Sequence, residues 1–506
     1  MKSKSISLPA PTGGWNARDS LADMAPKDAV IMENWFPLTT EATLRFGYTE
    51  FATGLPGQVE SLFVYSGGST EEIWGVSNGA FYDCSAGGAV GAAAVSGLSN
   101  SRWQYTNVAT PGGNFIMCAN GVNTPYLYDG ATWTSITGVS APAITGVTTT
   151  TLNTPVIFKT RLFFIQTGTL KTWYLPVNAV GGAASSIDIS AVAQLGGYIV
   201  AHDTWTLDAG TGVDDYYVIV TSRGEIVIYQ GTDPSSSTTW ALKGVWHIGQ
   251  PVGQRCLFKL QGDLLYISQD GLVPLSGALQ SSRVNPRVAL TDKIQFAVST
   301  AVSTYGSNFG WQVMYYAGEN QLYLNVPVNE GNDQQQYVMN TISKSWCNFT
   351  GWEANCWDIF AASPYFGGNT VVCKAWNGNT DNGNNINGNC LQAFSAYGNP
   401  GNVKRFSMIR PIFRSDGTPA ILGSMNLDFN ISISTASLSF SAPTSGLWDS
   451  AVWDTATWGG GLSVIQNWQS VYGVGYYGAP QMQISGGGIQ VRWVSTDIVY
   501  ETGAIL

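Results

Sequence analysis

The chain has 506 residues and a formal net charge of −10, and only 11% of its residues are charged, against about 25% in ordinary soluble domains. This length can bury a large core, and we expect two or more domains. The acidic balance argues against a protein that wraps DNA with Lys and Arg patches, but it is compatible with a channel through which DNA slides and with a charge that simply keeps the protein in solution.

The composition favours strands over helices. The chain has 59 Gly, 19 Trp, 23 Tyr and 20 Phe, which suits short strands joined by tight turns. Its seven cysteines are odd in number and scattered, so we expect reduced thiols in a protein made in the cytoplasm. The N-terminal stretch MKSKSISLPA lacks the apolar core of a signal peptide, and we find no apolar run near the ~18 residues of a membrane span.

The first 50 residues read as a docking arm. A Pro-rich, Gly-Gly start favours open backbone. Pro26–Asp28 then predicts a short helical turn, because Pro suits the first helical position and an acid suits a helix start. The candidate buried face of this turn is Ala29, Val30 and Met32. Asn34–Pro37 would end the helix, because a residue before proline is biased away from helix.

The middle of the chain is a series of β-hairpins. Each consists of two short runs of aromatic and β-branched residues on either side of a turn, and Asn-Gly and Asp-Gly supply the positive φ that tight turns require. A weaker candidate turn lies near residue 167. The clearer turns are at Asn78-Gly79, Asn120-Gly121, Arg223-Gly224, Gly262-Asp263, Asp270-Gly271 and Gly318-Glu319.

The hairpin spacing predicts a β-propeller over residues 51–398. The hairpin centres recur at roughly 40–57 residues, which is the length of one propeller blade. We expect about six blades, plus or minus one, and no helix longer than about three turns. The polar stretch Asn377–Asn389 reads as a loop. A calcium site is the alternative, but its Gly383 falls one place late for an EF-hand and no glutamate follows.

Residues 399–506 read as a separate antiparallel β-sandwich-like domain. Leu427–Ile433 and Leu438–Phe440 alternate polar and apolar residues as half-buried strands do. The N-terminal arm is a candidate for completing this unit. Trp448, Trp453 and Trp458 recur every five residues, which fits neither a helix nor a strand. They could form an aromatic platform for a sugar or a partner chain, or cap the sandwich through irregular turns.

Catalytic signals are weak. His202 and His247 lie in aromatic surroundings that predict packing in a core or an interface. The Gly75–Gly79 stretch matches Gly-x-Ser-x-Gly, but a strand follows it where a nucleophile elbow needs a helix. Asp214-Asp215 could be half of a glycosidase carboxylate pair, or solvated acids beside a turn. We therefore predict no enzymatic activity, no cofactor and no metal.

Both ends of the chain carry a recognisable pattern. The N-terminal pattern combines Gly13–Asn16, Asn34–Pro37 and Arg45-x-Gly47-Tyr48, and the C-terminal one reads KRFSMIRPIFRSDG from Lys404 and IQVRWVSTDIVY from Ile489. Together they resemble a large family of bacteriophage and prophage tail proteins. More loosely, the chain is similar to the β-propeller tail-nozzle or tail-hub proteins of short-tailed phages, which close the lower end of the portal channel.

The resemblance implies a structural virion protein of the phage tail. It would form a homo-oligomeric ring of six copies, extend the portal–adaptor channel, contact tail fibres or spikes, and retain and conduct viral DNA without sequence specificity. The alternative is a tail-tip protein that binds or cleaves glycans. Residues of the two patterns are predicted to serve assembly. The basic ones would pair with acids of neighbouring subunits or, alternatively, be ordinary surface charges. The predicted assembly residues are Trp15, Asn16, Asn34, Trp35, Phe36, Pro37, Lys404, Arg405, Arg410, Arg414, Arg492 and Trp493.

Overall fold

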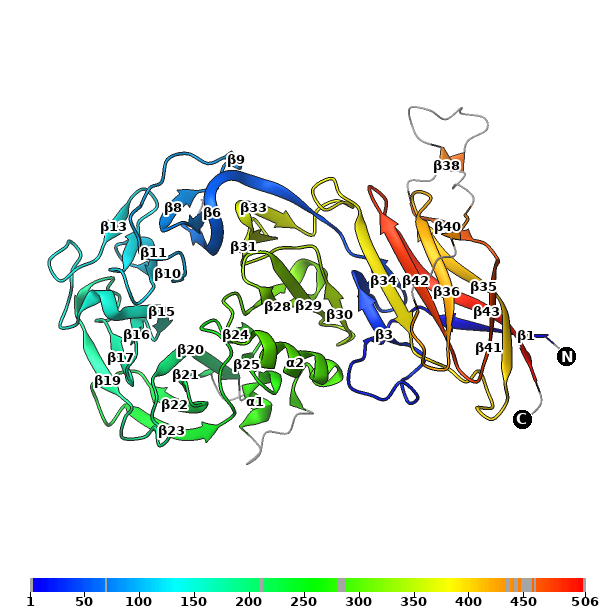
Figure 1. The fold of residues 1–506 in the computed structure, drawn as a ribbon. Coiled ribbons are helices and arrows are strands. Elements are labelled where there is room, and N and C mark those ends of the chain that lie inside the picture. Colours follow the sequence, from blue (N-terminus) through cyan, green and yellow to red (C-terminus); the bar gives the residue numbers. More distant parts are fainter. Residues whose placement is uncertain are drawn as a thin grey trace.

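The protein is all-β and consists of a β-propeller joined to a β-sandwich (Figure 1). The computed structural model describes residues 3–68, 71–208, 213–279, 288–432, 437–440, 445–446, 457–458 and 461–503. Small sheets follow one another around an axis, and the sandwich stands at one side of this ring with both chain ends. This confirms the predicted fold class.

In the described part of the chain seven successive β-units surround the propeller axis, and the sequence predicted about six, plus or minus one. Four of them are separate antiparallel sheets. Their strands are β10 (Gln104–Thr110), β11 (Gly113–Ala119), β12 (Tyr126–Tyr128) and β13 (Trp133–Ser135); β15 (Leu152–Phe158), β16 (Arg161–Gln166), β17 (Lys171–Tyr174) and β19 (Ser185–Asp188); β20 (Ile199–Asp208), β21 (Val213–Thr221), β22 (Glu225–Gly231) and β23 (Trp240–His247); and β24 (Leu257–Leu260), β25 (Asp263–Ser268) and β26 (Gly271–Pro274).

The other three units belong to two larger sheets, one of ten strands and one of seven. They are β27 (Gln312–Tyr316), β28 (Gln321–Asn329), β29 (Asp333–Asn340) and β30 (Trp346–Phe349); β31 (Cys356–Phe360), β32 (Ser363–Gly367) and β33 (Asn369–Ala375); and β7 (Glu71–Ser77) with β8 (Ala80–Asp83). Short strands are β9 (Gly88–Ala89), β14 (Ile144–Thr145) and β18 (Gly182–Ala183). Helical segments are α1 (Leu275–Ala278), α2 (Gln295–Tyr305), and the 3-10 turns η1 (Thr149–Thr151), η3 (Asp292–Ile294) and η4 (Ala317–Glu319).

The ring is closed by one long strand, β6 (Tyr48–Ser66). Its first part pairs with β33 at the end of the propeller, up to Gln58 opposite Asn369, and its second part pairs with β7 from Val59 onward. Pro56 cannot donate to a ladder, and Gly54 has a φ of +80°. The ladder with β33 is interrupted between Thr53 and Gln58, where these residues lie, and the strand passes to β7 at Val59, so that residues far apart in sequence share one strand.

The predicted hairpins agree with the structure at the level of single turns. The Asn78-Gly79 turn joins β7 to β8 with positive φ at both residues, 48° and 68°. The other predicted turns, including the weaker one near residue 167, also lie between antiparallel strands. Among the described residues the longest helix is α2, with 11 residues or about three turns.

The sandwich contains strands from both ends of the chain. Its outer sheet comprises β1 (Ser3–Pro9), β4 (Trp35–Pro37), β5 (Ala42–Leu44), β35 (Lys404–Ser415), β40 (Ser463–Gln466), β41 (Gln469–Gly475) and β43 (Val491–Thr502). The facing sheet comprises β2 (Gly14–Trp15), β3 (Asp28–Glu33), β34 (Ile386–Gln392), β36 (Ala420–Leu427), β37 (Ser437–Leu438) and β42 (Gly478–Gly486). The short strands β38 (Ser445–Gly446) and β39 (Thr457–Trp458) pair in parallel.

The strands β1 to β5 therefore belong to the sandwich, which confirms that the N-terminal arm completes this unit, and the chain enters the propeller at Tyr48. β1 pairs with β43 over seven residues, from Ser3 opposite Glu501 to Pro9 opposite Ser495. β3 also touches β30 of the propeller through Glu33 opposite Asn348. One continuous sheet thus runs from the propeller into the sandwich, and the two units share a hydrophobic core.

Two local predictions are wrong. Residues 28–33 form the strand β3 instead of a helical turn, because their backbone pairs with β34, with Met32 opposite Cys390. Leu427 ends β36, and the strand does not continue into the residues that follow it. Asp428 and Phe429 have φ of 47° and 65°, and the Asp428 carboxylate accepts the backbone N–H groups of Tyr476 and Tyr477 at 2.7 and 2.9 Å. Tertiary pairing overrides the local pattern in both places.

Candidate functional site at the propeller axis

A polar cavity of about 500 Å³ lies at the axis of the propeller. Seven chain segments line it, one from each β-unit, so the propeller fold itself creates the cavity. Their spacing along the chain is roughly one blade length. The lining residues fall at position 62 and at 103–107, 154–156, 201–203, 254–258, 312–315 and 356–359.

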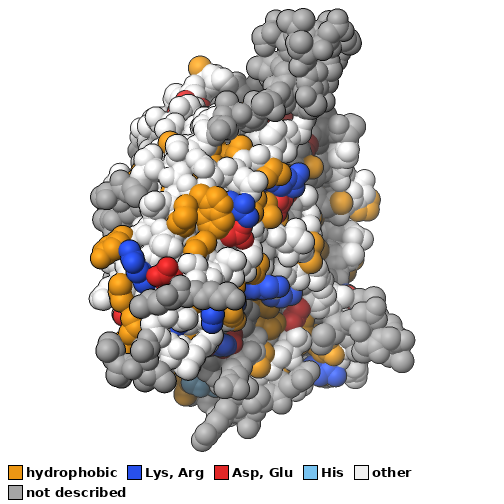
Figure 2. Space-filling model, turned by 90° about the vertical axis from the view of Figure 1, so that its right-hand side faces the viewer, with side chains coloured by type: hydrophobic (Ala, Val, Ile, Leu, Met, Phe, Trp, Pro, Cys, Tyr) orange, Lys and Arg blue, Asp and Glu red, His pale blue; other side chains and the backbone are white. Residues whose placement is uncertain are grey.

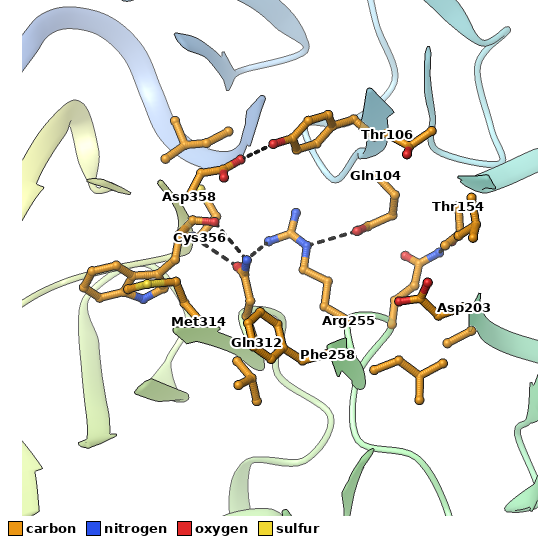
Figure 3. Close-up of a pocket in the computed structure, with 18 of the residues that line it drawn as sticks. Gln104, Thr106, Thr154, Asp203, Arg255, Phe258, Gln312, Met314, Cys356 and Asp358 are labelled. Carbon is orange, nitrogen blue, oxygen red and sulfur yellow. Dashed lines mark hydrogen bonds between the residues drawn. The ribbon is translucent and has the colours of Figure 1, made fainter. Parts of the chain in front are cut away.

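Arg255 is the positive group of this cavity (Figure 3). Its guanidinium donates to the side-chain oxygens of Gln104 and Gln312, both at 3.3 Å. It also donates to the Ser61 hydroxyl at 2.9 Å and lies over the Phe309 ring at 5.1 Å. Burial lowers the pKa of Arg255. The hydrogen-bond partners that we identify for this cation are neutral, so its charge is held by dipoles of the propeller wall.

Asp358 lies on β31 across the cavity from Arg255 (Figure 3). Its carboxylate accepts the Tyr105 hydroxyl at 2.6 Å and the backbone N–H of Ile359 at 2.8 Å. Burial raises the pKa of Asp358 to about 6, although both hydrogen bonds favour the charged form. The Tyr105 pKa is also raised well above its usual range by burial. Asp358 is half-buried.

The wall segment on β20, which is next to the one that carries Arg255, contains His202 and Asp203. The His202 ring is 2% exposed and contacts the Tyr217 hydroxyl and the Thr154 carbonyl. Burial lowers the His202 pKa to about 4. Burial also raises the pKa of Asp203, although Lys259 Nζ lies 2.7 Å from its Oδ1. The prediction that His202 is a packing residue is confirmed, whereas His247 is exposed.

The cavity can accept hydrogen-bonding groups, but the residues that could do chemistry there are held in other contacts. Cys356 lines the wall, and burial raises the pKa of its thiol to about 12, so it is a poor nucleophile. All seven cysteines are buried and free. Among the described residues there is no group of three or more His, Cys, Asp or Glu side chains that could hold a metal ion.

The other sequence candidates also have structural partners. Ser77 of the Gly-x-Ser-x-Gly string is fully buried and donates to the Gly57 carbonyl at 2.8 Å. Asp215 forms an ion pair with Lys159, and the Asp214 side chain lies outside the described residues. Trp448 and Trp453 also lie outside them, and only the backbone of Trp458 is described. The aromatic-platform hypothesis therefore stays a prediction.

Most residues predicted to serve assembly are core residues of this chain, which corrects that prediction. Trp35 and Trp493 are fully buried, with ring centroids 5.9 Å apart, and the Trp35 ring stacks on Phe413 at 6.4 Å. Large rigid side chains suit a hydrophobic core as well as an interface, and sequence alone does not separate the two. Phe36, Pro37, Asn16 and Asn34 are also buried, and half-buried Trp15 packs on Tyr337 at 5.3 Å.

Three of the five basic residues form ion pairs with acids of the same chain, and the predicted pairing with neighbouring subunits stays a prediction. Arg410 lies 2.9 Å from Asp497, and Arg414 and Arg492 both pair with Glu41, at 3.4 and 2.7 Å. Lys404 is fully buried, and its ammonium donates to the carbonyls of Asn399, Asn402 and Tyr476 at 2.8–3.0 Å. Arg405 is exposed. The two terminal patterns thus meet in one unit.

Sequence reasoning missed a buried ion pair at the junction of the propeller and the sandwich. Arg45 is 2% exposed and donates to both carboxylate oxygens of Asp381, at 2.8 and 2.6 Å. It also donates to Asn34 Oδ1 at 2.8 Å and lies over the Trp352 ring at 4.7 Å. Asp381 is in the loop that suggested a solvated turn or a calcium ligand. The Arg45-x-Gly-Tyr pattern was the available signal, but it did not reveal the partner.

Comparison with known proteins supports no family assignment. No protein-family model matches the sequence, and no curated protein matches it. Among solved structures, YCF48 from Cyanidioschyzon merolae aligns with 67% of this chain and 97% of its own, at 13% identity and a TM-score of 0.35. A structure described as BBS1N in complex with ARL6DN aligns with 46% of this chain and 73% of its own, at 12% identity and a TM-score of 0.30. No helix among the described residues is long and apolar enough to span a membrane.

Proposed function

We propose that this chain is a structural component of a phage tail, in which copies form a ring that continues the portal channel. The observation that carries the proposal is the resemblance of both terminal patterns to phage tail proteins, together with the place where these patterns meet. Trp35 from one pattern and Trp493 from the other pack in one core. The residues behind the resemblance therefore build a single structural unit.

Two further features support a role in assembly. The sandwich is fused to the propeller through one sheet and a shared core, so the two units can act as one rigid body. The face of the sandwich turned to the viewer in Figure 2 exposes apolar side chains. The exposed apolar residues of the outer sheet include Tyr472 at 86% and Val464 at 62%. Exposed apolar groups in a small region are a common mark of interaction surfaces.

In such a ring every formal charge on the bore repeats in each copy. The net charge of −10 per chain makes an acidic bore the simplest arrangement, and DNA within about 8 Å of it would be repelled at physiological salt. DNA could then pass without being gripped. The ring size, the adaptor or portal partner and the fibre contacts are parts of the same proposal.

The test is to prepare particles with and without this chain and to compare them. Mass spectrometry of purified particles should find the chain in a fixed copy number, and particles that lack it should lose packaged DNA. The matched control is the same particle complemented with the unchanged chain. Particles that contain no copy, or that retain their DNA and infect without it, would contradict the proposed function.

A further inference from the structure

The outer sheet of the sandwich has two open edges of opposite direction. β43 pairs with β1 on one side and with β35 on the other, and β35 pairs with β41, all antiparallel. The order is therefore β1, β43, β35, β41. Among the described residues neither β1 nor β41 has a strand partner on its outer side. Three antiparallel steps separate these edges, so β1 and β41 run in opposite directions.

We propose that β1 of one copy pairs with β41 of the next copy, so that the outer sheet continues from subunit to subunit. The inference deepens the proposed function and rests on its ring-forming part. Two copies in the same orientation place β1 of one beside β41 of the other as an antiparallel pair. Both strands have seven residues. Such a head-to-tail contact closes into a ring if its rotation permits.

Protection against edge pairing is unequal at the two edges. β1 carries a lysine, Lys4, and ends on Pro9, which are devices that keep an edge strand from pairing indiscriminately. β41 reads QSVYGVG, with no charge and no proline. Val474 on this strand is 56% exposed, and Trp468, the residue before the strand begins, is 36% exposed. An open edge of this kind is a template for another strand.

The inner face of β41 is covered at its two glycines by Leu427 and Asp428. A Cβ at Gly473 would lie 2.2 Å from Leu427 Cδ1, and one at Gly475 would lie 2.8 Å from Asp428 Oδ2. Leu427 and Asp428 therefore cover this face of the edge strand. On β1 the inward residues are Lys4, Ile6 and Leu8, because they lie opposite the buried Tyr500, Ile498 and Thr496.

Continuity of the inner face limits the register to steps of two residues, and one of these registers places Lys4 opposite Gly475, beside the Asp428 carboxylate of the next copy. The same register places Ile6, which is 37% exposed, opposite Gly473 and against Leu427. Leu8 then lies opposite Val471. A charge pair and an apolar contact thus agree on one register, whereas a one-residue slip would move Lys4 and Ile6 to the other face. In this arrangement Lys4 determines the register as well as protecting the edge.

Disulfide trapping tests the contact. The register puts Ser5 directly opposite Val474 of the next copy, within the Cα separation that a disulfide spans. Within one chain the two positions are three strand spacings apart, about 14 Å, which no disulfide bridges. Full-length Ser5→Cys and Val474→Cys variants are mixed at increasing concentration and oxidised. We expect a covalent dimer in the mixture and in neither variant alone, and a ladder up to ring size from the double variant.

In the matched control the Val474→Cys variant is mixed with a Val139→Cys variant instead of Ser5→Cys. Val139 is a propeller residue that is 95% exposed, and this mixture should give no specific covalent dimer. Lys4→Gln should weaken trapping by about two- to fivefold, as expected for one exposed ion pair. Lys27→Gln, at an exposed lysine outside the sheet edges, should leave trapping unchanged. Circular dichroism of each variant establishes that it is folded.

The outcomes separate the two proposals. Trapping in Ser5→Cys alone would indicate a symmetric β1–β1 contact and overturn the inference. Rings that form without the trapped pair, or a chain that stays monomeric with no trapped product, would overturn it as well. Trapped rings from a chain that is absent from phage particles would support the strand pairing and contradict the proposed function.

Discussion

The propeller and the sandwich differ in how far apart their paired residues lie in the sequence. Most propeller units are meanders, such as β24 to β26, in which each strand pairs with the one just before or after it. The sandwich instead pairs Ser3 with Glu501 and Thr43 with Arg492. Local pairing leaves its record in turn residues and alternation, whereas long-range pairing leaves little local trace. Substitutions of the buried side chains that connect distant parts of the chain are therefore the best test of the long-range pairing in the sandwich.

The largest effect is expected from Arg45→Ala. This change leaves the Asp381 carboxylate buried without its partner, and loss of one member of a buried pair costs about 3–5 kcal/mol of unfolding free energy. Chemical denaturation followed by fluorescence measures the shift in midpoint. Lys171→Ala is the control, because its pair with Asp188 is exposed and 3.8 Å long, and it should cost less than about 1 kcal/mol. Equal shifts would contradict the assigned role of Arg45.

Trp35→Ala should destabilise the fold by about 3 kcal/mol, since it empties a fully buried site between Phe413 and Trp493. Trp468→Ala is the matched control, because that side chain is 36% exposed. Thermal unfolding of the two variants measures the difference. If Trp35→Ala leaves stability unchanged and only lowers incorporation into particles, the residue acts at an interface, as the sequence suggested.

Neighbouring basic residues on β35 should differ sharply. Lys404→Ala leaves three carbonyls without the donor that they share, the buried Lys404 ammonium, which we expect to cost about 2 kcal/mol. Arg405→Ala removes an exposed side chain and should stay within about 0.5 kcal/mol. The same denaturation series measures both variants. A larger loss for Arg405 would mean that it has a structural partner.

The smallest effects are expected in the propeller cavity and depend on pH in opposite directions. The Asp358 pKa is raised to about 6, so the folded state binds the proton more tightly, and wild-type stability falls as pH rises from about 4 to 6. The His202 pKa is lowered to about 4, so stability falls as pH drops from about 6.5 towards 4. Each effect should be on the order of 1 kcal/mol.

Thermal unfolding of Asp358→Asn and His202→Gln across that pH range checks both signs. The advantage of Asp358→Asn over wild type should grow with rising pH. For His202→Gln, any stability deficit relative to wild type should shrink as pH falls. Parallel pH profiles for wild type and both variants would contradict the pKa directions assigned to the cavity.

These contrasts also show how much the sequence could reveal. The Asn78-Gly79 and Arg223-Gly224 turns were readable because positive φ restricts residue choice. The strand β3 was misread as a helical turn, because its partner β34 lies more than 350 residues away. The Arg255–Asp358 cavity was not predicted, since its wall residues come from seven units and only closure of the propeller brings them together.

Cryo-electron microscopy of particles that contain this chain tests the central proposal most directly. We expect a closed ring of copies on the portal axis, with propeller and sandwich in their present arrangement and with Asp and Glu outnumbering Lys and Arg on the bore. Particles without such a ring would contradict the tail-ring proposal. A ring whose bore carries more Lys and Arg than Asp and Glu would contradict free passage of DNA and indicate a channel that holds it.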